Sequence, residues 1–320
     1  MANAPATNLI AINDEESLRR KLEDLEDAYG EAIRNARRDI GCTDINVNDD
    51  GMIWSTVGGV SAPTGHILPE HAAKRIVTLV SDIDGQEIAK ASLNANLPTG
   101  ERFAAFLPPL VRRITISIRL PPKRIYTIDE YIEGGRMTER QADVLRQGVE
   151  DRDNILVVGS TGAGKTTLAN ALLAETAFRN SRTCIVQDQR ELQCAGTNVV
   201  SVVTGAMTTR EVIREFLRHN PDRIVVGEIR DGHSSEEWIG AGNTGHPGGL
   251  STVHANSAHL GLRRIASLTA KVTVNVDHHE IAEAVNLVVF ITKEGGHRRV
   301  VEIVRPTGYD GKKYLTDTLA

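Results

Sequence analysis

The chain has few cysteines and no long apolar run, and both absences restrict what it can be. Its three cysteines form no Cys-x-x-Cys pair, so the sequence contains no disulfide framework and fits a reducing compartment. No apolar run approaches the roughly 20 residues of a transmembrane helix. The N-terminal stretch lacks the apolar core of a secretory signal peptide. We therefore expect a cytoplasmic protein that contacts a membrane only peripherally.

A large excess of either charge is also absent. The formal net charge is −5 and the isoelectric point is about 6.1, which argues against a broad nucleic-acid-binding face. We expect no direct sequence-specific binding of nucleic acid. The content of 40% hydrophobic and 25% charged residues is that of an ordinary globular protein. A length of 320 residues accommodates two domains.

The hydrophobic pattern predicts an N-terminal α/β domain over residues 1–122. It is followed by a proline-rich and charged linker over residues 123–136 and a larger α/β domain over residues 137–320. Within the first domain, three- and four-residue apolar spacing predicts helices, and alternation predicts strands. The expected helices cover residues 14–40 and 69–82, and the expected strands cover 44–48, 52–55, 102–107 and 114–119.

The second domain alternates strand and helix, which is typical of a mostly parallel sheet. A capping box, Thr138-x-x-Gln141, begins its first helix, and the final two strands read as an antiparallel hairpin around Gly295 and Gly296. The expected strands cover 154–158, 183–187, 199–203, 223–227, 250–254, 285–292 and 298–304, and the expected helices cover 138–149, 165–179, 208–219, 234–241 and 257–270.

A glycine-rich loop in the second domain has the spacing G-x-x-x-x-G-K-T between a buried strand and a helix. Glycines at this spacing let backbone N–H groups turn inward around phosphate oxygens. The helix that follows favours an anion at its N-terminus. We expect Lys165 to reach the β- and γ-phosphates and the Thr166 hydroxyl to bind Mg²⁺. The predicted nucleotide-binding residues are Gly159, Ser160, Thr161, Gly162, Ala163, Gly164, Lys165, Thr166 and Thr167.

Hydrolysis also requires carboxylates at the ends of neighbouring strands. Glu228 follows the apolar strand 223–227 and is the candidate that activates water or holds a metal-bound water. Asp188 and Glu191, after the strand 183–187, are candidates for the metal or its water shell. Each of these acids has a simpler explanation as a solvated loop residue.

The segment 245–254 is rich in glycine and ends in His254. We expect His254 to sense the terminal phosphate and couple it to domain movement, while an ordinary structural histidine and a metal ligand are the alternatives. Arginine forks stabilise phosphate charge in a transition state. Apart from Arg230, no arginine follows Glu228 as an obvious clamp, so the N-terminal domain is a candidate source, from the same chain or a neighbour. Its candidate arginines are Arg102, Arg112, Arg113 and Arg119.

Together these motifs resemble the secretion ATPase superfamily, which drives type II and type IV secretion and pilus extension or retraction. The resemblance rests on the glycine loop, the acidic segment 187–192, the segment 226–231 and Thr252-Val-His-Ala-Asn256. It covers about residues 40–290, and within the superfamily the chain is most similar to the ATPases of type IV secretion and conjugation.

The resemblance implies a RecA-like C-terminal domain, a separate N-terminal domain and a homohexameric ring that binds ATP between them. It implies partners in a secretion or conjugation apparatus at the inner membrane. It gives Lys165 and Thr166 the Walker A roles, Glu228 the role of the Walker B acid and His254 that of the His-box histidine. Arg102 and Arg119 match the N-terminal arginines that reach the nucleotide.

One departure from the family concerns catalysis. The family's acidic segment usually reads Glu-Asp, whereas this chain has Gln187-Asp188. An amide cannot act as a base, so either Glu228 activates water alone or turnover is slow. A mechanical ATPase is our first hypothesis, and a nucleotide-gated scaffold that does not hydrolyse ATP is the second. A P-loop kinase and a nucleic-acid motor are further alternatives.

Overall fold

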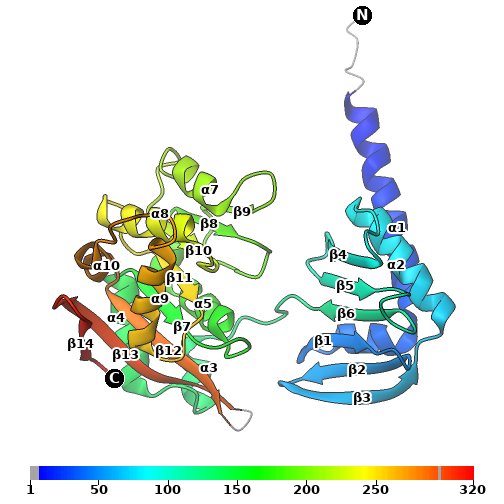
Figure 1. Cartoon of the computed structure of the whole chain (residues 1–320), viewed down its shortest axis with the longest axis horizontal. Helices are drawn as coiled ribbons and strands as arrows, with labels where there is room; N and C mark the ends of the chain where they lie inside the picture. The colour runs from blue at the N-terminus through cyan, green and yellow to red at the C-terminus, as the bar shows by residue number, and fades with distance from the viewer. Residues whose placement is uncertain (1–6, 295–296) are drawn as a thin grey trace, which may run out of the picture. The chain divides into compact units, whose positions relative to one another are not determined.

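The computed structural model describes residues 7–294 and 297–320. These residues form two compact units, one ending at Lys123 and the other beginning at Arg124 (Figure 1). Residues 123–136, assigned to a linker by sequence, include the short helix α3 (Ile128–Glu133), which lies in the second unit. Within the described ranges, no helix combines the length and the apolar character that a membrane-spanning segment requires.

The first unit is a two-layer α/β domain with a six-stranded antiparallel sheet. The strand order is β3-β2-β1-β6-β5-β4, and both helices pack on the face that carries the buried alternate residues, among them Ile45, Phe103 and Ile118. Its elements are α1 (Thr7–Arg38), β1 (Cys42–Val47), β2 (Met52–Val57), β3 (Val60–Ile67), α2 (Glu70–Asp84), β4 (Ser92–Asn96), β5 (Arg102–Phe106) and β6 (Thr115–Arg119).

The predicted hairpin in this unit is confirmed, and the central strands agree with their alternating pattern. Gly51 has a φ of 82°, which the turn between β1 and β2 requires. Two strands were not predicted. β3 contains Pro63 and Gly65, and both β3 and β4 lie at sheet edges, where one-sided pairing tolerates polar residues and weakens the strand pattern.

The first helix ends earlier than predicted and is interrupted. It stops at Arg38 rather than residue 40, and Gly30 inside it has a φ of 68° and a ψ of 177°. Only glycine adopts this conformation readily, so Gly30 separates two helical segments. Leu25, Tyr29 and Ile33 are nevertheless buried in the core of the first unit.

The second unit has the predicted RecA-like α/β fold, with a mainly parallel sheet of eight strands. The order is β14-β13-β12-β7-β11-β10-β8-β9, and only β13 and β14 run antiparallel to their neighbours. Besides α3, its helices are α4 (Glu139–Glu150), α5 (Lys165–Leu173), α6 (Thr176–Arg179), α7 (Thr209–Phe216), α8 (Gly232–Asn243), α9 (Ala258–Thr269) and α10 (His278–Ala284). Its strands are β7 (Ile155–Val158), β8 (Thr183–Gln187), β9 (Val199–Val203), β10 (Arg223–Val226), β11 (Leu250–Val253), β12 (Leu287–Glu294), β13 (His297–Tyr309) and β14 (Tyr314–Thr318).

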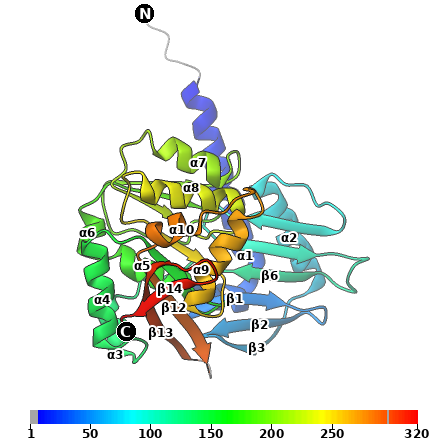
Figure 2. The ribbon, with the colours of Figure 1, turned by 60° about the vertical axis from the view of Figure 1, so that its left-hand side comes forward.

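Helices cover both faces of this second sheet (Figures 1 and 2). One core lies between the sheet and α7, α8, α9 and α10, and the other lies between the sheet and α3, α4, α5 and α6. Every residue of β7, β8, β10 and β11 is buried, as expected for parallel strands covered on both sides. Polar side chains can therefore reach solvent only beyond the strand ends.

The predicted elements of this unit are largely confirmed, and the clearest differences concern one helix and one edge strand. The helix expected over 165–179 is two helices, because the chain leaves helical geometry at Glu175, whose φ is −66° and ψ is 153°. The strand β14 at the edge of the sheet was not predicted. The capping box of Thr138 and Gln141 is present at the start of α4. The hairpin residues Gly295 and Gly296 lie outside the described residues.

Candidate functional site

The glycine-rich loop connects β7 to α5, and its backbone requires glycine at two positions. Gly164 has a φ of 99° and immediately precedes α5, a conformation that a residue with a side chain adopts only under strain. At Gly159, a Cβ atom would lie 2.4 Å from the carbonyl oxygen of Ile291. The loop therefore needs glycine at both positions, and its amides lead directly into the N-terminus of a helix.

Lys165 is buried at the start of α5, and groups of the protein itself accept the hydrogen bonds that its ammonium donates. Its Nζ donates to the carbonyl oxygens of Gly159 and Ser160, both at 3.1 Å, and lies 3.0 Å from Nδ1 of His254. An ammonium group has three protons to donate. A phosphate oxygen that binds Lys165 must therefore replace at least one of these acceptors.

Glu228 lies just beyond the end of β10, where it contacts two basic side chains. Its Oε1 is 2.9 Å from Nε2 of His254, and its Oε2 accepts a hydrogen bond of 2.9 Å from Nη2 of Arg230. Burial by itself raises the pKa of Glu228, but the hydrogen bond and charge of Arg230, together with His254 and Lys165, hold this pKa below its ordinary value. The side chain is thus a carboxylate at neutral pH.

His254 links Glu228 to Lys165, and this position determines its protonation. Burial and the nearby charge of Lys165 lower the pKa of His254, although Glu228 opposes the shift. The ring is consequently neutral at pH 7. Since the ammonium of Lys165 can only donate, Nδ1 must accept, and Nε2 carries the ring proton 2.9 Å from Oε1 of Glu228. Lys165, His254 and Glu228 therefore form one continuous series of polar contacts.

The acidic segment after β8 joins this site through Arg230. Asp188 accepts a hydrogen bond of 2.7 Å from Arg230 and one of 3.0 Å from Thr204. The charge of Glu191 also acts on Arg230. The structure therefore brings Asp188, Glu191 and Glu228 around one guanidinium group at the carboxyl ends of β8 and β10.

Gln187, the departure from the family's acidic segment, has a structural role in the loop after β8. Its buried side chain accepts hydrogen bonds from the amides of Glu191 and Leu192, at 2.9 and 2.8 Å, and donates to Ser201 at 3.0 Å. An amide suits this position because it can accept and donate at once. A glutamate could not donate to Ser201 without being protonated.

The residues around the loop fit a magnesium ion only together with phosphate. Within the described ranges, no group of three or more His, Cys, Asp or Glu side chains could hold a metal. Mg²⁺ is commonly bound by one or two protein oxygens, substrate phosphates and water. Thr166, next to Lys165 in α5, offers a hydroxyl of this kind. Asp188 and Glu228 as metal ligands stay a prediction.

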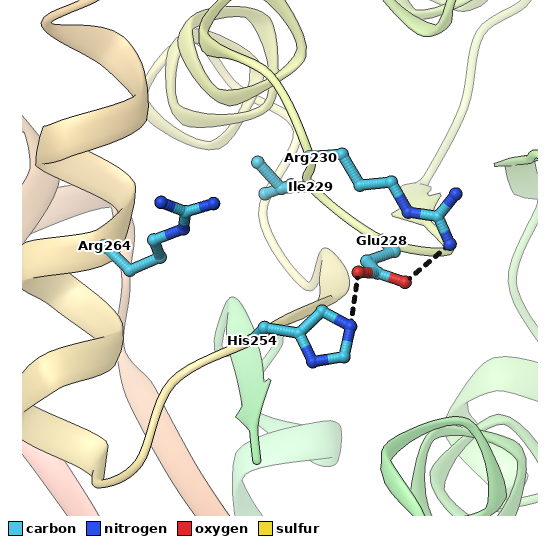
Figure 3. A pocket seen from close by; sticks show the side chains of 5 residues that line it. All are labelled: Glu228, Ile229, Arg230, His254 and Arg264. Atoms are coloured by element: carbon cyan, nitrogen blue, oxygen red, sulfur yellow. Dashed lines mark hydrogen bonds and ion pairs between the residues drawn. The ribbon is translucent and has the colours of Figure 1, made fainter. Parts of the chain in front are cut away.

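A pocket of about 280 Å³ opens beside the contacts of His254 and Glu228. It is lined by Glu228, Ile229, Arg230, His254 and Arg264 (Figure 3). In this view, the guanidinium groups of Arg230 and Arg264 lie on either side of Glu228. Arg264, on α9, was missed by the sequence analysis. Its only signal was a basic residue on the helix after His254, which does not distinguish it from a solvated side chain.

The candidate arginines of the first unit fall into two groups. Arg102 and Arg119 are direct partners in the β5–β6 pairing, so they project from the same face of that sheet. Arg113 instead donates to the carbonyl oxygen of Asp50 at 3.1 Å. The described contacts give Arg112 no role. A contact of Arg102 or Arg119 with nucleotide stays a prediction.

Comparison with known proteins agrees with this geometry and with the predicted resemblance. Residues 67–298 match the family described as "Type II/IV secretion system protein". The chain is 36% identical to the conjugal transfer protein TrbB of Rhizobium radiobacter, covering 94% of this chain and 95% of that protein. It is 35% identical to a probable TrbB of Sinorhizobium fredii, covering 92% of each.

A solved structure supports the same fold. The Legionella pneumophila ATPase DotB superposes with a TM-score of 0.66 at 18% identity, over 86% of this chain and 79% of that one. The expected family, and within it the resemblance to conjugal-transfer proteins, is confirmed. This chain belongs to the type II/IV secretion system protein family.

Proposed function

We propose that the protein is an ATPase that powers conjugative transfer or type IV secretion through nucleotide-driven movement of its two domains. The series of polar contacts Lys165–His254–Glu228 carries this proposal. It connects the loop that would hold the triphosphate to the carboxylate that would activate water. Family membership and the TrbB relatives support the assignment to conjugation or secretion.

In the proposed reaction, Glu228 accepts a proton from the attacking water, which displaces ADP from the γ-phosphorus. Lys165 and the loop amides hold the β- and γ-phosphates. A bound Mg²⁺, held by Thr166 and phosphate oxygens, would neutralise charge on the phosphates. Arg230 keeps Glu228 ionised and oriented through its hydrogen bond, so the base is ready before nucleotide arrives.

His254 would couple the state of the nucleotide to the rest of the protein. When Lys165 turns toward a phosphate oxygen, Nδ1 of His254 loses its donor. The ring can then accept a hydrogen bond from another donor or rotate, while its Nε2 still contacts Glu228. Loss of the terminal phosphate restores the first arrangement. This exchange gives the site two states that domain movement can follow.

The lowered pKa of His254 predicts a pH dependence of stability. The folded protein resists a proton that the unfolded chain accepts near a pKa of about 6.5. The neutral ring therefore contributes fully to the free energy of unfolding above about pH 6.5. This contribution is lost as the pH falls through the lowered pKa of the folded state. Below that pKa, the charged ring would repel Lys165 and Arg230. Urea unfolding should show a steeper loss of stability between about pH 7.5 and 5.5 for the wild type than for His254→Gln.

His259→Gln is the matched control, since His259 lies on α9 and is not one of the contacting residues Lys165, His254 and Glu228. The free energy of unfolding of the His259→Gln variant should change with pH as that of the wild type does. The pKa of Glu228 is lowered, so its titration falls below this pH range. Parallel curves for the wild type and His254→Gln would refute a neutral His254 that accepts a hydrogen bond from Lys165.

We further propose that the active form is a homo-oligomer, a hexameric ring in the cytoplasm attached peripherally to the secretion or conjugation apparatus at the inner membrane. The family resemblance supports this, as do Arg102 and Arg119, which would clamp the nucleotide from the same chain or a neighbouring one. In sedimentation experiments, Mg²⁺ with non-hydrolysable ATP should favour the ring. ATPase activity per subunit should rise with protein concentration as rings assemble.

Mixed subunits would show where the clamp comes from. If Arg119 acts on a neighbour's nucleotide, mixtures of Lys165→Ala and Arg119→Ala chains should recover part of the activity that each lacks alone. Specific activity that stays constant over a wide dilution series would contradict the ring. Nucleotide-dependent assembly without any turnover would instead favour the non-hydrolysing scaffold.

A further inference from the structure

Arg298, at the start of β13, contacts the glycine-rich loop, although it belongs to none of the sequence motifs. Its Nε donates a hydrogen bond of 3.0 Å to the carbonyl oxygen of Gly162. Its Cδ would lie 3.0 Å from a Cβ atom placed on Gly164. The side chain therefore lies against the middle of the loop and gives a second reason for glycine at position 164.

Arg298 differs from the other arginines of β13 in its pairing, because no carboxylate forms an ion pair with it in the described part of the chain. Arg299 pairs with Glu294, and Arg305 pairs with Asp153, each at 2.9 Å. Across residues 7–294 and 297–320, no ion pair is found for Arg298, and the carbonyl of Gly162 is the acceptor of its Nε. The two Nη groups of the guanidinium, with four further N–H donors, remain available beside the loop.

We propose that Arg298 is a nucleotide-binding residue that donates to the polyphosphate held by the loop. Its Nε anchors the guanidinium on Gly162, and the Nη groups supply a second cation besides Lys165. A guanidinium group suits a phosphate because it can donate two parallel hydrogen bonds to two phosphate oxygens. This inference rests on the proposed function, since it requires the loop to hold a nucleotide.

The test is the affinity of the full-length protein for fluorescently labelled ADP in the presence of Mg²⁺. Charge-assisted hydrogen bonds of this kind justify an expected increase in Kd of about 10-fold or more for Arg298→Gln. Arg298→Lys should recover part of the affinity because it keeps the cation. Arg299→Gln, which removes a cation one residue away and on the other side of the strand, should bind as the wild type does.

A salt titration separates direct contact from support of the loop. Direct contact predicts that Kd rises less with salt for Arg298→Gln than for the wild type, since one ionic contact is gone. A purely structural role would leave the salt dependence unchanged. Thermal unfolding checks that each variant is folded, and the lysine variant answers the question if the glutamine variant is not.

Besides an unchanged salt dependence, three results would overturn the inference while leaving the proposed function intact. They are wild-type affinity in Arg298→Gln, no recovery in Arg298→Lys, or an equal loss in Arg299→Gln. Failure of the wild-type chain itself to bind ADP would overturn the proposed function and this inference with it. The two failures are therefore distinguishable in one set of titrations.

Discussion

Replacing Glu228 with glutamine should leave ATP binding nearly unchanged and lower the rate of ATP hydrolysis about 10²- to 10⁴-fold, the range for loss of a positioned base. The carboxylate is 18% exposed and held between His254 and Arg230. An amide has a similar shape but cannot take a proton from water. Phosphate release should therefore almost stop while titrations with labelled ATP still saturate.

The structure adds a detail to this expectation. The amide of the Glu228→Gln variant has one oxygen, so it can accept from His254 or from Arg230 but presents N–H groups to the other. Glu237→Gln is the matched control, because Glu237 also pairs with arginines, Arg210 and Arg214, but is not among the candidate site residues. It should retain far more activity. Hydrolysis by Glu228→Gln at the wild-type rate would show that another group is the base.

Replacing Lys165 with alanine should weaken binding of Mg²⁺-ATP by about 100-fold, since one or two charge-assisted hydrogen bonds to phosphate are lost. The same change removes the donor that holds Nδ1 of His254. Hydrolysis at saturating ATP should therefore also fall, which a loss of ground-state binding alone would not cause. Equilibrium titration gives the first effect, and steady-state kinetics gives the second.

Lys271, an exposed residue just after α9, provides the control for loss of one positive charge. Lys271→Ala should bind and hydrolyse ATP as the wild type does. If Lys165→Ala bound ATP with wild-type affinity, the glycine-rich loop would not be the phosphate site. The roles proposed for His254 and Arg298 would fall with it, because both depend on a phosphate at this loop.

The sequence predicted the inner strands well and the edges poorly. The strand 183–187 was predicted with the bounds that the structure has, since TCIVQ is fully buried in a parallel sheet. In contrast, β3, β4 and β14 lie at sheet edges, where half-paired strands tolerate polar residues. The expected helix 165–179 was wrong because the chain turns at Glu175 without glycine or proline to mark the break.

The members of the site were predicted better than their arrangement. Lys165, Glu228 and His254 were each identified from local motifs, because the loop spacing and the ends of buried strands are visible in the sequence. The role of Gln187 was not, since its partners become apparent only when the loop after β8 folds back. Arg264 and Arg298 approach the site from elements that have no motif of their own.

The sequence by itself determined the glycine-rich loop, the α/β class and the family, because these depend on residues close together in the chain. Glycine at position 164 and the helix after it need no distant partner. Only the tertiary structure decided that the side chains of Lys165, His254 and Glu228 contact one another in series. It also decided that Nδ1 of His254 must accept a hydrogen bond. The physical reason is that parallel strands bring their carboxyl ends to one edge of the sheet, so groups far apart in sequence meet there and set each other's protonation.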